Sequence, residues 1–364
     1  SLSTTPYPDS PSGLTVSSVN DSTVTLSWTA GSETDLVRYR IYEGTSVDAA
    51  TLVDSVGASF TSKSVGGLTN GTTYYFVIVV VDGDGYVSGH SNVVSGTPEY
   101  KGPVWYVDDD ATNANGDGSS GLPFREIDDG IEAASTGDTV MVLPGTYDRA
   151  GDQELSFIFY NNTQNSYTVK NIVLMSRDGA ATTILDGESS RVFQMQYQSI
   201  NQNNTTTVLV NDTSLQIIGF TIKGSNGGDE SSDGSLIKIQ GGSVYEGYVD
   251  GQYVYTYYNN GVTFKNCIIA DTDSDAGSNN NISGLLNLQY ADARFIDCII
   301  RDNSVTSNYS YGTIRLASKS SLYMNRCKIV RNTVISEGGR VTGGAISTNP
   351  SDHTVKIINC VIAD

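Results

Sequence analysis

The fold is decided by the stretch Val262-Thr-Phe264-Lys-Asn266-Cys267-Ile-Ile269, an eight-residue pattern that occurs five times in the second half of the chain. The other four copies align with it without a gap: Leu215–Ile222, Ala293–Ile300, Leu322–Ile329 and Val355–Ile362. Successive copies begin 47, 31, 29 and 33 residues apart. Repeats of this length indicate a solenoid, in which each coil buries its apolar face against its neighbours.

Each copy is predicted to contain two short strands joined by a sharp bend. Its apolar residues alternate, skip one extra position and then alternate again, which is the period of a strand interrupted once. The bend residues are Gly219, Asn266, Asp297, Arg326 and Asn359. Glycine, asparagine and aspartate tolerate the left-handed backbone conformation, so the bend has a conformational cause in four of the five copies.

A third strand is predicted between the copies. The candidate segments are Ile237-Lys-Ile239, Leu286-Asn-Leu288, Ile314-Arg-Leu316 and Ile346-Ser-Thr348. A glycine stands two residues before the first apolar position in the last three segments. Three strands in each turn of about 30 residues make a β-solenoid.

Residues 103–364 resemble the right-handed parallel β-helix of the pectate-lyase-like superfamily. The resemblance rests on the five copies and on the entry to the solenoid: Trp105-Tyr-Val107-Asp, then Ile127-x3-Ile131-x2-Ala134, then Gly137-Asp138-Thr-Val140 and Gly145-Thr-Tyr147. It implies a short amphipathic helix that covers the first coil. It implies little about function, because the same solenoid supports lyases, hydrolases, epimerases, tailspikes and inert surface proteins.

The four cysteines, Cys267, Cys298, Cys327 and Cys360, occupy the same position in consecutive copies. In a stack of coils they lie about 4.8 Å apart along one column. This distance alone does not exclude a disulfide between adjacent coils, but side chains that point the same way into a core seldom reach disulfide geometry. No Cys-x-x-Cys pair or nearby histidine favours a metal site. We interpret the four residues as buried thiols.

The first hundred residues follow a different pattern, of short alternating segments separated by turn residues, which indicates an antiparallel β-sandwich. The segments Leu14-Thr-Val16, Val24-Thr-Leu26-Ser-Trp28, Tyr39-Arg-Ile41-Tyr42 and Leu68-Thr-Asn-Gly71-Thr-Thr-Tyr74 resemble the fibronectin type III family. The resemblance implies a core indole at Trp28, a tyrosine corner at Tyr74 and a spacer or adhesive role. The predicted fold class is therefore all-β: a fibronectin type III sandwich (1–99), a linker (100–102) and a right-handed parallel β-helix (103–364) with a short N-terminal capping helix.

The composition limits the partners. The chain has 364 residues, with 21 basic and 40 acidic side chains and a formal charge of −19. An acidic surface repels phosphate backbones, so nucleic acid is not an expected partner. The longest apolar run, from Tyr74 to Val81, is far shorter than the roughly 20 residues of a membrane-spanning helix, so no membrane insertion is expected. Loops rich in Ser, Thr, Asn, Gly and Tyr predict an extracellular or cell-surface protein.

The outward face of the third strand is the candidate site for chemistry. Its column reads Lys238, Asn287, Arg315, Ser347, followed by Gln240, Gln289, Ala317, Asn349. Lys238 and Arg315 lie two coils apart, about 10 Å, so their long side chains could converge on a uronate. A lyase needs one group to neutralise the carboxylate and a base to take the α-proton. Basic residues that face water on a solenoid are also ordinary, so a calcium-dependent polysaccharide lyase acting on uronate-containing glycans is the alternative function.

Two acidic loops are candidate calcium sites. The first contains Asn113, Asn115 and Asp117 and follows three consecutive aspartates; the second contains Asp271, Asp273 and Asp275. Oxygen ligands at alternate positions around a glycine suit calcium, although the first loop begins with asparagine and lacks the bidentate glutamate of a calcium loop. A solvated acidic turn is the other interpretation of each loop.

The insertion that lengthens one repeat to 47 residues holds six tyrosines around Asp250-Gly251, a predicted hairpin. These tyrosines are Tyr245, Tyr248, Tyr253, Tyr255, Tyr257 and Tyr258. Tyrosines supply contact area at little entropic cost, so they suit platforms for sugar rings or for another protein chain. A hairpin packed onto its own solenoid would use them internally, and the sequence favours neither arrangement.

The sequence stops directly after the fifth copy, so we expect either a continuing chain or another chain to cover the last coil. A head-to-tail contact there would build a filament. The preferred function is a non-catalytic, secreted or cell-surface structural or adhesive protein. Its rigid solenoid is expected to bind extracellular glycans or copies of itself, with calcium as the one cofactor considered.

Overall fold

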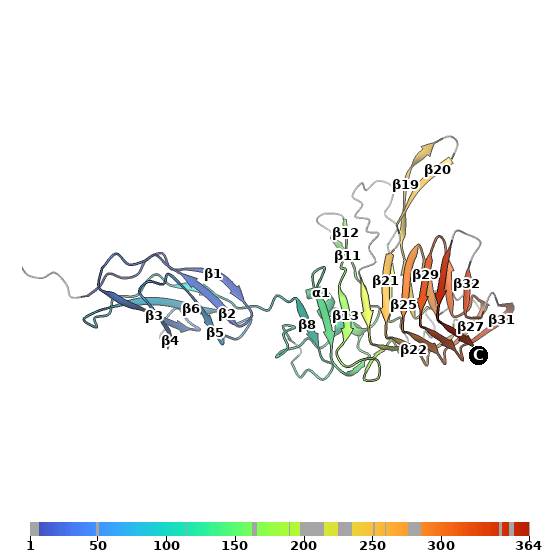
Figure 1. Ribbon diagram of the computed structural model, residues 1–364, viewed down its shortest axis with the longest axis horizontal. Helices are drawn as coiled ribbons and strands as arrows, with labels where there is room; N and C mark the ends of the chain where they lie inside the picture. Colours follow the sequence, from blue (N-terminus) through green and yellow to red (C-terminus); the bar gives the residue numbers. More distant parts are fainter. Residues whose placement is uncertain are drawn as a thin grey trace, which may run out of the picture. The chain divides into compact units, whose positions relative to one another are not determined.

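The computed structural model describes residues 7–48, 51–113, 115–161, 166–188, 190–196, 215–224, 235–249, 252–258, 260–275, 285–341, 344–348 and 353–363. The chain forms two compact units, Ser1–Lys101 and Gly102–Asp364 (Figure 1). Strands make up most of the secondary structure in both units, and the predicted all-β fold class is confirmed. The described part of the chain contains no helix that is long and apolar enough to cross a membrane.

The first unit is an antiparallel sandwich of two sheets. One sheet has the order β1-β2-β5, with β1 Thr15–Asn20, β2 Thr23–Ser27 and β5 Ser62–Gly66. The other has the order β4-β3-β6-β7, with β4 Thr51–Gly57, β3 Leu36–Gly44, β6 Tyr74–Asp82 and β7 Val94–Gly96. Trp28 and Tyr39 are buried between the sheets with ring centroids 5.1 Å apart. The Tyr74 hydroxyl accepts a hydrogen bond from the backbone N–H of Thr69 at 3.2 Å, as a tyrosine corner requires.

The second unit stacks parallel strands into long sheets, as a β-helix does (Figure 1). The eight-stranded sheet contains β8 Val104–Val107, β9 Thr139–Val142, β13 Val173–Ser176, β16 Gln216–Ile218, β21 Asn260–Lys265, β25 Ala291–Ile296, β29 Ser321–Asn325 and β33 Thr354–Ile358. The seven-stranded sheet contains β10 Gly145–Tyr147, β14 Thr183–Asp186, β17 Thr221–Lys223, β22 Ile268–Ala270, β26 Ile299–Arg301, β30 Lys328–Val330 and β34 Val361–Ala363. The five-stranded sheet contains β15 Phe193–Gln196, β18 Ile237–Gln240, β24 Leu286–Gln289, β28 Ile314–Ala317 and β32 Ile346–Thr348.

A fourth strand appears in some coils and extends the predicted count of three. β23 Asp273–Asp275, β27 Ser304–Ser310 and β31 Thr333–Val341 form a separate parallel sheet. The strands are polar along much of their length, so they carry little of the apolar alternation from which the other strands can be predicted.

Equivalent residues of successive coils are paired in register, so the core consists of columns. Phe264 lies beside Phe295 with parallel rings whose centroids are 4.9 Å apart. Cys267, Cys298 and Cys327 are buried free thiols in a neighbouring column, and Cys360 is partly exposed. The interpretation of the cysteines as core thiols agrees with these positions.

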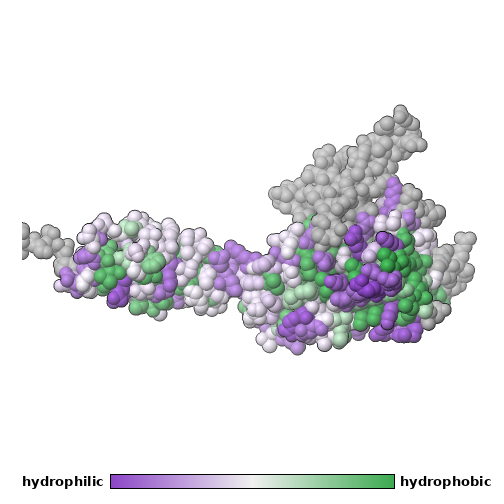
Figure 2. Space-filling model, viewed as in Figure 1, coloured by the Kyte–Doolittle hydropathy of each residue, from purple (hydrophilic) through white to green (hydrophobic). Residues whose placement is uncertain are grey.

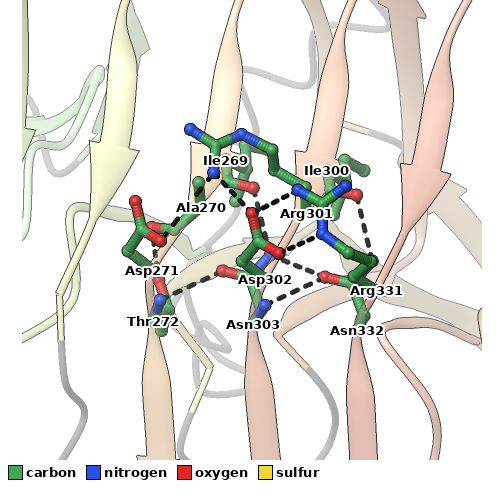
Figure 3. A network of polar contacts seen from close by, with 10 residues as sticks. All are labelled: Ile269, Ala270, Asp271, Thr272, Ile300, Arg301, Asp302, Asn303, Arg331 and Asn332. Atoms are coloured by element: carbon green, nitrogen blue, oxygen red, sulfur yellow. Dashed lines mark hydrogen bonds and ion pairs between the residues drawn. The ribbon is translucent and has the colours of Figure 1, made fainter. Parts of the chain in front are cut away.

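The first bend of each of the five copies is left-handed, with φ of +79° at Gly219, +53° at Asn266, +55° at Asp297, +54° at Arg326 and +52° at Asn359. A second left-handed bend, not predicted, follows the next strand at Asp271, Asp302 and Arg331. Beside it, Asn303 donates to the carbonyl of Ile269 at 3.0 Å and to Asn332 Oδ1 at 2.8 Å (Figure 3). This buried amide ladder joins three coils.

The N-terminal end of the solenoid is covered by α1 Ile127–Ala133, as predicted. The one-turn η1 Ala150–Asp152 lies against it. Asp152 is fully buried, and its Oδ1 accepts a hydrogen bond from the first helical N–H, that of Ile127, at 2.8 Å. At the other end of the helix, Lys170 Nζ donates to the carbonyls of Ile131 and Glu132. Two distant residues therefore satisfy the free backbone groups of this short helix.

Two antiparallel hairpins project from the coils (Figure 1). The first is β11 Ile158–Asn161 paired with β12 Ser166–Val169, which the sequence pattern did not predict. The second is β19 Gly242–Val249 paired with β20 Gln252–Tyr258, which brackets the predicted turn at Asp250-Gly251.

Candidate functional site

A column of polar residues lies on the outward face of the five-stranded sheet. Its members are paired in register from β15 to β32: Gln194, Lys238, Asn287, Arg315 and Ser347. The neighbours of the first four along each strand are apolar and buried, because side chains alternate between the two faces. Ser347 is flanked by the half-buried Ile346 and the exposed Thr348. We call these five residues the polar column.

Two members of the polar column are buried although they face outward. Asn287 is 4% exposed and Ser347 is 7% exposed. The Arg315 guanidinium lies over the ring of Tyr311, 4.5 Å from its centroid, and the Ser347 hydroxyl donates to the Tyr311 carbonyl. Tyr311 therefore holds the end of the column through both its ring and its backbone, and this residue was not singled out in the sequence.

A buried arginine holds the polar column at its β15 end. Arg191 is 7% exposed and donates from Nη1 to Gln194 Oε1 at 3.0 Å. Its Nε donates to the carbonyl of Ser235 at 3.1 Å. Gln194 is therefore oriented by a charged donor from its own coil and is restrained at the start of the column.

Lys238 and Arg315, the pair considered for lyase chemistry, lie on the same column with Asn287 between them. Two strand spacings separate their backbones by about 10 Å. The arrangement places two cations on one outward surface, with the buried amide of Asn287 between them. Such a set is suited to hydrogen bonding with carboxylates and hydroxyls.

The tyrosine-bearing hairpin leaves the solenoid beside this column. β19 begins two residues after Gln240, the last residue of β18, and the N–H of Gly241 donates to the carbonyl of Gln289 at 2.8 Å. The backbone register places Tyr245 opposite Tyr255 and Tyr248 opposite Tyr253, with a bulge between Tyr245 and Gly247. The side chains of residues 242–260 lie outside the part of the chain that the structure describes.

The register has a consequence for the six tyrosine positions. Residues directly opposite each other in an antiparallel pair share a face, and alternate residues of one strand share it too. The positions on one face of the ribbon are 245, 248, 253, 255 and 257, because the bulge returns position 248 to the face of 245; position 258 is on the other.

The first predicted calcium loop lies near a carboxylate cluster. One oxygen from each of Asp108, Asp109 and Asp110 lies within 4.8 Å of the others. Burial, together with the charges of its two neighbours, raises the pKa of Asp109 above its usual range, while the backbone N–H of Thr146 opposes this shift through a hydrogen bond of 3.1 Å. Crowded carboxylates of this kind favour an added positive charge.

The predicted ligands of that loop are engaged in turns. Asn113 Oδ1 accepts from the N–H of Asn115 at 2.9 Å, and Asp117 Oδ1 accepts from the N–H of Ser119 at 2.9 Å. Both amide and carboxylate retain further lone pairs for a ligand.

In the second predicted calcium loop, Asp271 occupies a left-handed bend 3.9 Å from the Arg301 guanidinium (Figure 3). Asp273 begins β23 and is exposed, whereas the side chain of Asp275 lies outside the described residues. Arg301 also contacts Asp302, whose pKa Arg331 and then Arg301 lower to about 2. The acidic residues near this bend are thus partly neutralised by arginines.

Two family models match the chain. The model of the fibronectin type III domain matches residues 9–97, and the model described as "Protein of unknown function (DUF1565)" matches residues 111–352.

Among curated proteins, the chain is 26% identical over 253 residues to Chitinase D of Niallia circulans, covering 66% of this chain and 44% of that protein. It is 37% identical over 99 residues to Chitinase Chi52 of Paenibacillus xylanexedens, covering 26% and 18%. The chain thus spans less than half the length of either relative.

Among solved structures, an Fn3-like protein from Clostridium thermocellum is 26% identical over 26% of this chain and 93% of that chain, with a TM-score of 0.22. The spore cortex lytic enzyme SleM of Clostridium perfringens is 18% identical over 25% of this chain and 28% of that chain, also with a TM-score of 0.22. The match over residues 111–352 covers well over half of the sequence, whereas residues 9–97 match a separate module. The chain therefore has an N-terminal fibronectin type III domain and belongs to the DUF1565 family of proteins of unknown function.

Proposed function

We propose that the chain is a secreted or cell-surface carbohydrate-binding protein, with the solenoid as a rigid binding rod and the sandwich as a spacer. The observation that carries this proposal is the polar column of the five-stranded sheet together with the hairpin that starts two residues beyond it. Hydroxyl-rich ligands need donors and acceptors at fixed spacing, and the column supplies them on paired strands. Regular strand pairing holds these groups in place without a mobile loop.

The tyrosine positions support the same function. Five of the six lie on one face of the β19–β20 ribbon by register. Aromatic side chains at such positions would offer flat, amphipathic surfaces that suit the C–H faces of sugar rings. Contact of these tyrosines with a glycan or with another protein chain is part of the proposal.

The relatives guide the choice of glycan. Both curated relatives are named chitinases. We therefore propose an insoluble polymer of amino sugars as the first ligand to test. Because the protein would meet such a polymer outside the cell, an extracellular or cell-surface location is part of the same proposal.

The test is a depletion assay on insoluble chitin with the full chain and two sets of variants. Tyr253→Ala combined with Tyr255→Ala is expected to weaken binding about tenfold or more, because both positions share one face of the ribbon. The matched control is Tyr86→Ala, an exposed tyrosine of the sandwich. The proposal is wrong if the wild-type chain stays in solution, or if the control loses as much binding as the hairpin variant.

The second candidate function is a polysaccharide lyase that acts on uronate-containing glycans. It is favoured by the placement of Lys238 and Arg315 on one outward column, separated by Asn287. In this function Arg315 would neutralise the uronate carboxylate, and Lys238 would take the α-proton before the glycosidic bond breaks to leave an unsaturated sugar. New absorbance from unsaturated ends that disappears in Lys238→Ala and Arg315→Ala supports the lyase; no such absorbance in the wild type rejects it.

We also propose calcium as a ligand of the acidic entry to the solenoid. The converging oxygens of Asp108, Asp109 and Asp110 support it, since calcium prefers carboxylate oxygens. Calcium titrated into chelator-treated protein is expected to raise the melting temperature of the solenoid, and Asp109→Asn is expected to reduce that rise. Equal melting temperatures with calcium and with chelator contradict the proposal.

Self-assembly is a further part of the proposal. Successive coils pair in register along each parallel sheet. In a head-to-tail contact the coils of a second copy would continue this stack. Light scattering of the natural full-length protein tests it: rods that lengthen with concentration are expected, and a monomer at every concentration contradicts it.

A further inference from the structure

The outward face of the eight-stranded sheet carries a second group of residues that no part of the proposed function uses. Figure 2 shows hydrophilic residues gathered over β21, β25 and β29. On this face the register pairs Arg294 with Tyr323 and Tyr323 with Lys356, and it sets Lys265 and Asn325 in the adjacent column. We call Lys265, Arg294, Tyr323, Asn325 and Lys356 the cationic strip.

The cations of this strip differ from the arginines at the bends of the same coils. Arg326 and Arg331, at the bends, each hold an aspartate through two hydrogen bonds of 2.6 and 2.7 Å. Arg294 is exposed and makes no hydrogen bond or ion pair with the described residues. Lys356 is exposed too, and its one described contact is with the ring of Tyr323, 5.9 Å from the centroid.

The other members of the strip are polar or aromatic. Lys265 is exposed and helps to lower the pKa of Asp297, behind the larger effect of Arg326. Asn325 Oδ1 is buried and accepts no hydrogen bond within the described part of the chain. The surface therefore offers two uncompensated cations, an aromatic ring between them and the half-buried amide of Asn325 beside the ring.

The charge of the chain makes this local excess unusual. Residues 103–160 hold two basic and twelve acidic side chains, whereas residues 262–364 hold ten basic and nine acidic ones. A polyanion is repelled by the entry of the solenoid and meets a nearly neutral segment around the strip. Asp297 and Asp302 of that segment are paired with arginines, which reduces the negative charge around the strip.

We propose that the cationic strip binds an acidic polysaccharide, a linear glycan with carboxylate or sulfate groups, lying across β21, β25, β29 and β33. Arg294 and Lys356 lie two strands apart, about 10 Å, so they meet anionic groups on either side of the sugar that rests on Tyr323. The ring and the amide select a sugar over other polyanions, which the cations alone would not do.

The strip lies on a different sheet from the polar column, so this inference goes beyond the proposed function and can fail separately. The experiment measures binding of the full chain to polygalacturonate, dextran sulfate and neutral dextran by affinity electrophoresis at moderate salt. Arg294→Gln combined with Lys356→Gln is expected to weaken binding of the acidic polymer at least about tenfold. Lys328→Gln, an exposed cation of the seven-stranded sheet, is the matched control and is expected to change binding less than about twofold.

The ring is tested separately. Tyr323→Leu keeps the cations and is expected to reduce binding of the acidic polysaccharide while leaving weak binding of inorganic polyphosphate, which has no rings to stack, unchanged. If only polygalacturonate binds, the strip recognises carboxylate groups, and if only dextran sulfate binds, it recognises sulfate groups. Both outcomes support the proposal. Three outcomes overturn it: equal binding of neutral dextran, equal loss in the Lys328→Gln control, or tighter binding of DNA than of either acidic glycan.

Variants of the β19–β20 hairpin separate this inference from the proposed function. If Tyr253→Ala with Tyr255→Ala abolishes chitin binding but leaves binding of the acidic polymer unchanged, the two surfaces act independently. If the chain binds no neutral glycan yet responds to the Arg294 and Lys356 substitutions, the proposed function fails and the cationic strip stands.

Discussion

At the bends of the solenoid, single residues carry a conformation that most side chains avoid. Asn266 is exposed and has a φ of +53°, and Arg326 holds the equivalent position with a φ of +54°. Left-handed backbone costs an ordinary residue roughly 1 kcal/mol or more, and asparagine and glycine least. At these positions the left-handed backbone conformation, and not a side-chain contact, limits which residues are tolerated.

Substitution of Asn266 tests this argument. Asn266→Val is expected to destabilise the solenoid by about 1–2 kcal/mol, because a β-branched residue is strained at positive φ. Asn266→Gly is expected to be neutral or slightly stabilising. Denaturant unfolding of both variants gives the comparison, and equal stability of the two would show that the bend is not conformationally limited.

Asn303 is the residue on which the second bend depends. It is 2% exposed, donates to Ile269 and Asn332, and accepts from the N–H of Thr272 at 3.2 Å. Asn303→Ala leaves these groups without partners and is expected to cost about 2–3 kcal/mol. A double-mutant cycle with Asn332→Ala is expected to give a coupling near 1 kcal/mol, since the two amides are bonded to each other. Additive losses of stability would show that the two amides do not stabilise each other.

Asp152 gives the solenoid a specific pH dependence. Burial raises its pKa to about 6 against a reference of 3.8, although the N–H groups of Ile127 and Arg149 oppose the shift. The folded state therefore binds more protons than the unfolded state between pH 4 and 6, so this group's contribution to stability is full below pH 4 and falls as pH rises through 6. The fall is about 3 kcal/mol at most.

The variant Asp152→Asn isolates this effect, because the amide does not titrate. Relative to the wild type, the variant is expected to become more stable as pH rises from 4 to 7. The comparison of the two proteins also cancels the effect of the ion-paired Asp297 and Asp302. Arginines lower the pKa values of these two groups, so their contribution to stability rises with pH in both proteins. A constant difference across this range would contradict the assignment.

At the scale of elements, the cysteine column behaves as packing. The Cys298 thiol lies between Cys267 and Cys327, and its hydrogen bond with Cys267 raises its pKa to about 12. The pKa of Cys327 is also raised, first by its bond with Cys298 and then by burial. Thiols that stay protonated are poor nucleophiles.

Labelling with a thiol reagent tests this state. Cys360 is partly exposed and is expected to react in the folded protein, whereas the other three react only after unfolding. Reductant is expected to leave the melting temperature unchanged. A reductant-sensitive melting temperature would show a disulfide between coils and would contradict the interpretation.

The strands that could be predicted are those whose apolar pattern repeats without insertion. The five copies identify β16, β21, β25, β29 and β33 with their following strands, and the third strand is visible at Ile237 and its equivalents. The earlier coils, with β9 and β13, fall outside the five copies for two reasons. Gly145 takes the place of the apolar residue after the first bend, and residues 177–182 lengthen the bend between β13 and β14. The second bend and Tyr311 could not be predicted, because polar residues at a bend and an aromatic residue in a loop show no periodic pattern.

At the scale of the molecule, the two compact units are built from different contacts. The sandwich depends on apolar packing around Trp28 and Tyr39, and the solenoid on paired columns. Calorimetry of the full chain is expected to show two transitions. Asn266→Val should lower only the one that belongs to the solenoid. A single transition that moves as a whole would show that the units unfold together.

The central claim is that a glycan binds at the polar column and the hairpin beside it. Hydroxyl-radical footprinting of the full chain, with and without a soluble chitooligosaccharide, reads this directly, because tyrosine side chains are readily oxidised. Protection is expected at the tyrosines of β19 and β20 and at Tyr311, with Tyr86 of the sandwich unchanged. Protection confined to the sandwich, or no protection at a saturating ligand concentration, would contradict the claim.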